Sequence, residues 1–234
     1  MKERIQKILA SRGVASRRQA EKMILDGRVS CNGAICTLGQ SADAELDIIL
    51  LDGKPLPSGI VHIYIMLNKP RGYVTTMRDE KGRKDVSELV ADCPERVYPV
   101  GRLDMDSEGL LLFTNDGEFA NCLMHPSHQV NKIYRVNVVG YSQIGLEKLQ
   151  QPIVIDGYQI HKPDVKLLRK CDDKAELLIT IHEGRNRQVR KMCAAAGMKV
   201  TRLIRVQEGS LTLGTLQPGK WRYLTQEEIA SLMK

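Results

Sequence analysis

Two aspartates, Asp104 and Asp106, lie in a short loop bounded by Gly101 and Gly109, directly before the apolar run Leu110–Phe113. A loop that leads into a buried strand is held by the core but can open onto a cleft, where a reactive carboxylate would be placed. Such a carboxylate could act as a nucleophile, or the pair could share acid–base work. The residues alone leave a second interpretation open, because Asp and Gly in loops commonly form turns.

The distribution of charge points to a polyanionic partner. The chain of 234 residues has a formal net charge of +7. Residues 1–28 hold eight Lys and Arg against three acidic residues, and residues 182–205 hold seven against Glu183 alone. Two separated basic blocks predict a nucleic acid that contacts the protein twice, because each neutralised phosphate releases counterions. Two solvated basic faces would leave the same pattern, so charge does not choose between them.

Composition limits the class of protein. Hydrophobic residues make up 42% of the chain, which is enough for a packed core. No run of eighteen or more apolar residues occurs, and the N-terminus leads into a charged segment, so we expect a soluble cytoplasmic protein. The six cysteines form no Cys-x-x-Cys pair and no Cys/His grouping. We therefore expect reduced thiols and no metal site.

The N-terminal segment predicts two helices. Apolar residues recur at helical spacing over residues 2–12, and Gly13 follows as a stop signal. Ser16 and Gln19 form a Ser-x-x-Gln capping box that begins a second helix, which is expected to run to Asp26. The two helices are close in sequence, so we expect them to be neighbours.

A hairpin and a linker follow the helices. Residues 29–34 predict a strand that enters an Asn-Gly turn, which typically closes a β-hairpin. Residues 55–59 contain two prolines and a glycine, which discourage regular structure. We therefore expect a small helix-helix-hairpin domain over residues 1–58 and a second domain over residues 59–234.

Beyond the linker, strand-like and helix-like segments are interleaved without the regular rhythm of a doubly wound fold. This order predicts an α+β domain with a mixed, mainly antiparallel sheet flanked by helices. Strands are expected at 62–67, 73–76, 97–100, 110–114, 133–139, 175–181, 199–206 and 210–213, and helices at 118–124, 143–150, 187–196 and 225–233.

Residues 8–33, ILASRGVASRRQAEKMILDGRVSCNG, resemble the S4 RNA-binding domain, a module of ribosomal proteins and RNA-modifying enzymes. The resemblance implies that this part of the chain binds RNA through a positive surface on its two helices. The basic residues expected there are Arg4, Lys7, Arg12, Arg17, Arg18 and Lys22.

Residues 101–117, GRLDMDSEGLLLFTNDG, resemble the catalytic-aspartate motif of the RsuA/RluB family of ribosomal RNA pseudouridine synthases. Residues 67–73 (LNKPRGY), 132–134 (KIY) and 183–192 (EGRNRQVRKM) are similar to further motifs of that family, in the expected order. With the S4-like start, these motifs cover nearly the whole chain. The resemblance implies an S4 domain followed by a pseudouridine synthase catalytic domain, which needs no cofactor.

Carried over by position, the resemblance implies that Asp104 is the nucleophile, whereas Asp106 lies where the family requires no acid. The reaction detaches uracil from its ribose, turns the base and rejoins it through C5. The carboxylate would attack C1′ of the sugar or C6 of the base, and the sequence leaves both routes open. A carboxylate charged in a water-excluding pocket needs a cation. Arg190 stands where the motif supplies one, and its planar fork can hold both oxygens.

Other site residues follow from the same resemblance. Tyr134 would stack on the uracil and could move a proton from C2′ or C5, and Lys132 shares its face of an alternating strand. Arg102 would occupy the space that the target base leaves when it is flipped out of folded RNA. The remaining contacts to RNA, chiefly to its phosphates, are expected from Arg185, Arg187 and Gln188.

The expected function is therefore the isomerisation of uridine in ribosomal RNA. Residues 114–126 are closer to the RluB-like branch, which favours large-subunit (23S) RNA or a precursor particle as substrate of a monomeric enzyme. Two alternatives stay open: a synthase for small-subunit (16S) RNA, and a non-catalytic RNA-binding or ribosome-assembly factor that keeps the fold. Hydrolysis by Asp104 and Asp106 is the weaker third hypothesis, because nothing supports a general acid for it.

Overall fold

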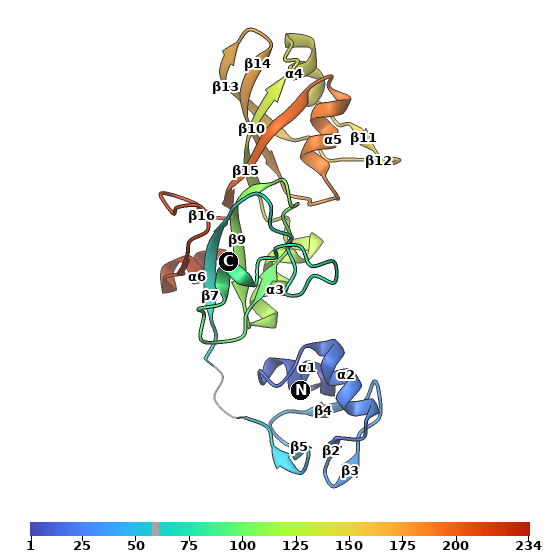
Figure 1. The fold of residues 1–234 in the computed structure, drawn as a ribbon. Coiled ribbons are helices and arrows are strands. Elements are labelled where there is room, and N and C mark those ends of the chain that lie inside the picture. Colours follow the sequence, from blue (N-terminus) through green and yellow to red (C-terminus); the bar gives the residue numbers. More distant parts are fainter. Residues whose placement is uncertain (58–60) are drawn as a thin grey trace. The chain divides into compact units, whose positions relative to one another are not determined.

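The computed structural model describes residues 1–57 and 61–234 (Figure 1). Residue contacts divide the chain into two units, which are described separately below. The N-terminal unit comprises Met1–Ile63 with Asn115–Gly117, and the C-terminal unit comprises Tyr64–Thr114 with Glu118–Lys234. The domain boundary expected between residues 58 and 59 lies outside the described residues.

The structure confirms the two predicted helices of the N-terminal unit. Helix α2 (Arg17–Leu25) starts after Ser16, whose side chain forms the reciprocal capping box with Gln19. Helix α1 (Ile5–Ser11) is shorter than expected, because Lys2–Arg4 form strand β1, which pairs with β4 (Ser41–Asp43). The core of this unit holds the apolar face of both helices, including Ile5, Ile8, Leu9, Ala20 and Ile24.

The predicted hairpin is confirmed and belongs to a four-stranded sheet with the order β3-β2-β5-β6. Asn32 and Gly33 turn the chain with positive φ values of 51° and 83°, as a two-residue hairpin loop requires. The expected linker begins later than predicted, because Pro55 pairs with Leu50 in the last strand. The bounds are β2 Val29–Cys31, β3 Ala34–Ile35, β5 Ile49–Leu51 and β6 Lys54–Pro55.

The C-terminal unit is built on a nine-stranded sheet with the main order β13-β14-β10-β15-β9-β7-β17. Its described strand pairs are antiparallel except for β9 and β15, so the expected mixed, mainly antiparallel sheet is confirmed. The strands are β7 Tyr64–Lys69, β8 Tyr98–Val100, β9 Glu108–Thr114, β10 Lys132–Val139, β13 Asp164–Cys171, β14 Lys174–Ile181, β15 Lys199–Glu208, β16 Leu211–Thr212 and β17 Trp221–Tyr223.

Strand β9 is central, as its unbroken apolar run predicts, and Leu110–Thr114 are fully buried. One core cluster joins it to residues from two helices, α3 and α6. Residues 73–76 do not form the expected strand, since only Val74 makes an isolated bridge, to Asp85. The α-helices are α3 Gly117–Met124, α4 Gln143–Leu149, α5 Gln188–Ala195 and α6 Gln226–Leu232, and the 3-10 turns are η1 Glu88–Val90 and η2 Pro126–His128.

Candidate functional site

A cleft of about 1110 Å³ gathers seven of the eight site residues that the sequence predicted in the C-terminal unit. Asp104 lines it together with Arg102 and Tyr134. Further predicted residues on its wall are Lys132, Arg185, Arg187 and Gln188. Residues from the second basic block therefore meet the aspartate motif in one concave surface, although about 80 residues separate them in the sequence.

Asp104 lies on the aspartate loop, which we define as Gly101–Gly109. Leu103 and Ser107 anchor this loop, with 6% and 1% of their surfaces exposed. The Ser107 amide donates to the Asp104 carbonyl at 3.0 Å, which closes a turn between them. At Gly109 the backbone has φ +103°, and an added Cβ would lie 2.3 Å from the Arg205 carbonyl oxygen on β15. Only glycine permits this approach of β9 to β15.

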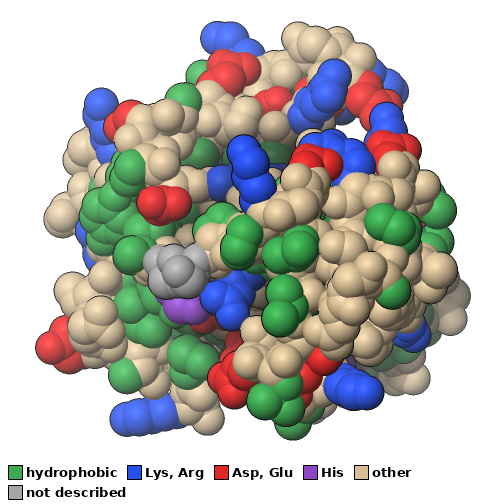
Figure 2. Space-filling view, turned by 90° about the horizontal axis from the view of Figure 1, so that it is seen from below, with side chains coloured by type: hydrophobic (Ala, Val, Ile, Leu, Met, Phe, Trp, Pro, Cys, Tyr) green, Lys and Arg blue, Asp and Glu red, His purple; other side chains and the backbone are tan. Residues whose placement is uncertain are grey.

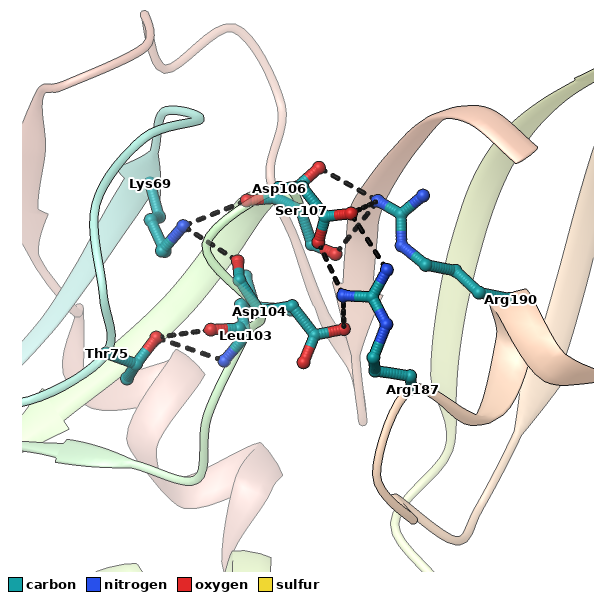
Figure 3. A network of polar contacts seen from close by, with 8 residues as sticks. All are labelled: Lys69, Thr75, Leu103, Asp104, Asp106, Ser107, Arg187 and Arg190. Atoms are coloured by element: carbon teal, nitrogen blue, oxygen red, sulfur yellow. Dashed lines mark hydrogen bonds and ion pairs between the residues drawn. The ribbon is translucent and has the colours of Figure 1, made fainter. Parts of the chain in front are cut away.

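Two buried donors hold the backbone of the aspartate loop (Figure 3). The Lys69 Nζ donates to the carbonyls of Asp104 at 3.1 Å, Ser107 at 2.9 Å and Pro70 at 3.2 Å. The Thr75 hydroxyl donates to the Leu103 carbonyl at 2.6 Å and accepts from its amide at 3.2 Å. The backbone that carries Asp104 is thus fixed from within the fold.

Sequence reasoning missed both donors. Lys69 is fully buried, and among residues 1–57 and 61–234 no carboxylate lies within salt-bridge distance of its ammonium group. Desolvation lowers the pKa of Lys69 to about 8. A lysine that ends an apolar strand immediately before a proline was the available signal, because such a residue has to enter the core with its strand.

Two arginines approach the aspartates from the opposite side (Figure 3). Arg187 pairs bidentately with Asp106, at 2.9 Å and 3.0 Å, and its Nη1 lies 3.6 Å from Oδ2 of Asp104. Arg190 Nη2 donates to the Asp106 carbonyl at 2.8 Å and lies 3.3 Å from Oδ2 of Asp106. The hydrogen bond from Arg187 lowers the pKa of Asp106.

The expected pairing of Arg190 with Asp104 is thus replaced by a different one. Arg187 is the cation beside Asp104, whereas Arg190 holds the loop through Asp106. The reason is local: Arg187 adopts a left-handed conformation with φ 53° at the start of α5, and Arg190 lies one turn further along the helix. The side chain of Asp104 is 30% exposed, so its carboxylate faces the cleft and is not sealed in a dry pocket as expected.

Tyr134 and Lys132 share a face of β10, as the alternation predicts. Tyr134 is 8% exposed, and burial raises the pKa of its hydroxyl. On the neighbouring strand β15, where Arg205 is the partner of Tyr134, lies an ion pair that sequence reasoning missed. Its Arg205 Nη2 and Glu208 Oε2 are 3.3 Å apart, and both side chains are 2% exposed. The Arg205 Nε donates to the Leu110 carbonyl at 2.7 Å, which ties the pair to β9.

The remaining predicted RNA-binding residues of this unit have different surroundings. Arg102 is exposed at the cleft. Arg185 stacks on Tyr158, with its Cζ 3.3 Å from the ring centre. Gln188 is only 3% exposed, and its amide binds Glu183 and the Arg185 backbone, each at 3.0 Å. Gln188 therefore fixes the loop from inside and does not reach outward to RNA as expected.

The predicted basic residues of the N-terminal unit are partly exposed. Arg4, Arg17, Arg18 and Lys22 are exposed, whereas Lys7 and Arg12 are half-buried and Lys7 pairs with Glu3. On the face seen in Figure 2, exposed hydrophobic side chains lie among both basic and acidic ones. On this unit such exposed side chains include Leu25, Ile35 and Leu46.

Three further observations concern metal, thiols and membranes. Among residues 1–57 and 61–234, no group of three or more His, Cys, Asp or Glu side chains could hold a metal ion. The six cysteines are free thiols. The helices in the described part of the chain are too short or too polar to cross a bilayer.

Comparison with known proteins gives the site its context. The family model described as RNA pseudouridylate synthase matches residues 63–195, and the S4 domain model matches residues 3–48. An uncharacterized RNA pseudouridine synthase of Aquifex aeolicus is 47% identical, over 100% of this chain and 95% of that protein.

The ribosomal large subunit pseudouridine synthase B of Bacillus subtilis is 43% identical, over 98% of this chain and 95% of that protein. A crystal structure of a pseudouridylate synthase shares 31% identity and superposes with a TM-score of 0.69, over 98% of this chain and 99% of that one. The chain therefore belongs to the RNA pseudouridylate synthase family and carries an N-terminal S4 domain.

Proposed function

We propose that this chain isomerises a uridine of large-subunit ribosomal RNA to pseudouridine, with Asp104 as the nucleophile. One observation carries the assignment of the residue: the Asp104 carboxylate faces a cleft and lies 3.6 Å from the Arg187 guanidinium, on a loop whose backbone is held from within. The choice of large-subunit RNA is supported by the printed name of the Bacillus subtilis relative.

The chemistry requires a group that can add to the nucleotide and later leave. The bond between N1 and C1′ breaks and a bond between C5 and C1′ forms, while C5 loses a proton and N1 gains one. A carboxylate can attack C1′ of the sugar or C6 of the base and depart afterwards. The Arg187 guanidinium lies beside that carboxylate, and Tyr134 is proposed to stack on the uracil and to move a proton from C2′ or C5.

Positioning makes the addition possible, since a small displacement of the reacting atom slows a reaction severely. We propose that Lys69, Thr75 and Arg190 serve this purpose, because each binds the backbone of the aspartate loop. Their contacts do not depend on the charge of Asp104, so the loop keeps its shape while the carboxylate reacts.

The target uridine has to leave its helix or loop to reach Asp104. Flipping a base out of folded RNA costs a few kcal/mol, and we propose that Arg102, exposed beside the cleft, occupies the vacated space. The S4 domain, expected over residues 1–58, would bind a second RNA segment through its exposed arginines while residues 59–234 form the catalytic domain. We further propose that the enzyme is a monomer and acts on cytoplasmic ribosomal RNA.

The decisive experiment measures product on two defined RNAs. Large-subunit and small-subunit ribosomal RNA, transcribed with uridine tritiated at C5, are incubated separately with the protein, and tritium release is followed. We expect release from the large-subunit RNA alone, and mapping of the product then identifies the modified uridine. Release from the small-subunit RNA alone would reassign the substrate, and tight binding without release from either RNA would favour a non-catalytic assembly factor.

A further inference from the structure

A short hairpin on the wall of the cleft presents an exposed tyrosine. Strands β11 (Val154–Ile155) and β12 (Tyr158–Gln159) form this hairpin, which lies beside α5 (Figure 1). Ile155 is buried within it, and an ion pair between Lys191 and Asp156 ties the turn to α5. The hairpin is therefore anchored, yet Tyr158 remains 38% exposed. The hairpin thus holds a partly accessible aromatic ring at the cleft, the kind of group on which an unpaired base can stack.

The Arg185 guanidinium lies over this ring. Its Cζ is 3.3 Å from the ring centre, the distance of direct stacking. Its backbone amide donates to Gln188 Oε1 at 3.0 Å, and its Nε lies 3.7 Å from Oε2 of Glu183. Oε1 of Glu183 also accepts from the His161 amide at 3.0 Å. The guanidinium is thus held in position before any ligand arrives.

The stacked pair is close to the proposed reaction centre. Arg185 is two residues from Arg187, so about 7 Å of backbone at most separates them, and Arg187 contacts Asp104. Tyr158 and His161 line the same cleft as Asp104. Its volume of about 1110 Å³ exceeds the range of roughly 300–1,000 Å³ that is typical for one small ligand. The cleft has room for more than the target nucleotide.

We propose that Tyr158 and Arg185 form a stacking platform for an unpaired RNA base that neighbours the target uridine. Unpaired bases are recognised by stacking on aromatic rings and on guanidinium planes, and the platform offers both. The His161 ring, whose centre lies 4.7 Å from that of His182, extends the aromatic surface along the same wall. This inference rests on the proposed function and changes the expected role of Arg185, from gripping a phosphate to holding a base.

The test is a double-mutant cycle, in which a substitution in the protein is combined with an abasic substitution in the RNA. The probe is an RNA fragment that carries the mapped uridine, with one abasic nucleotide placed in turn at each nearby unpaired position. Binding is measured in the Asp104→Asn background, so that no reaction occurs. Stacking of one base predicts that a single abasic position weakens binding about tenfold. The same abasic site should have no further effect once Tyr158→Ala is present.

Matched variants separate stacking from other roles. Tyr158→Phe keeps the ring and should bind as tightly as Tyr158, whereas Tyr223→Ala removes another exposed tyrosine, outside the cleft, and should change nothing. Arg185→Lys keeps the positive charge but loses the planar guanidinium group on which a base can stack. We therefore expect weaker RNA binding with an unchanged salt dependence. Full binding by Arg185→Lys, with a salt slope reduced by about one in Arg185→Ala, would instead assign a phosphate contact and overturn the platform.

Failure of this inference is distinguishable from failure of the proposed function. Two outcomes would overturn the platform while the protein still converts its RNA: Tyr158→Ala binds RNA like Tyr223→Ala, or the effects of the protein and RNA substitutions are additive. In both cases the proposed synthase activity stands. If no ribosomal RNA is converted or bound, the proposed function is wrong, and the platform is withdrawn with it.

Discussion

The two walls of the cleft are built in opposite ways. The aspartate loop (Gly101–Gly109) is held through its backbone by buried donors, above all Lys69. The arginine loop, which we define as Glu183–Arg187, is held through side chains: the buried Gln188 binds Glu183 and the Arg185 backbone. Glu183 is 16% exposed, and Arg185 and Arg187 are 47% and 43% exposed. We infer that the two walls have different roles: the aspartate loop holds the reacting atom, and the arginine loop presents its exposed cations to RNA.

The largest expected effect tests which carboxylate reacts. Asp104→Asn should lower the rate of tritium release at least about 10⁴-fold, as loss of a nucleophile does, while RNA affinity changes little. Asp106→Asn should cost far less, because that carboxylate only holds Arg187 and Arg190. Single-turnover kinetics measures both. An equal loss in the two variants would mean that the aspartates act as a pair.

Lys69→Met should produce the next largest effect. The change leaves the carbonyls of Asp104 and Ser107 without their buried donor, and each unsatisfied group costs about 1–3 kcal/mol. We expect kcat to fall about 100-fold while KM stays within twofold, since the arginine loop is untouched. Circular dichroism shows whether the variant folds. A folded variant with normal kcat would contradict the proposal that Lys69 positions the aspartate loop for reaction.

Thr75→Val removes a hydroxyl from the same wall without changing the shape of the side chain. Leu103 then loses partners for its amide and carbonyl, and we expect kcat to fall about tenfold. Thr75→Ser restores the hydroxyl and should recover most of that loss. If serine does not rescue, packing of the methyl group is the relevant property, and the proposed hydrogen-bonded positioning is wrong.

The pH dependence should differ between activity and stability. Burial lowers the pKa of Lys69 from 10.5 to about 8, so the folded protein loses the third proton of this ammonium as the pH rises through 8. We expect kcat to fall several-fold between pH 7 and 9, and this step should be absent in Lys69→Met. Between about 8 and 10.5 the unfolded state binds more protons, so the contribution of Lys69 to unfolding free energy rises with pH. Kinetic and denaturation profiles check the two trends.

The smallest effect is expected on the arginine loop. Glu183→Gln keeps an acceptor for the His161 amide but removes the charge beside Arg185. Partly exposed ion pairs contribute little, so we expect KM to rise about threefold with kcat unchanged. Steady-state kinetics at two salt concentrations measures this. A loss confined to kcat would show that the arginine loop also positions the reacting atom.

Much of the fold could be predicted because several helices, turns and strands are specified by residues that are neighbours in the sequence. The capping box at Ser16, the Asn-Gly turn and the apolar run of β9 each specify an element through neighbouring residues. Strand β13 was missed because most of its residues are exposed, which leaves no alternation to detect. Strand β1 was missed because it exists only through pairing with residues 41–43.

The sequence by itself determined the family, the S4 domain and the aspartate motif, since these reside in contiguous residues. Only the tertiary structure decided which partners the aspartates have. Lys69 reaches a carbonyl 35 residues away, and Arg187 reaches a carboxylate 81 residues away. Two arginines three residues apart are equivalent candidates in a sequence. The direction in which helix α5 begins placed Arg187 beside Asp104 and turned Arg190 towards the backbone of the loop.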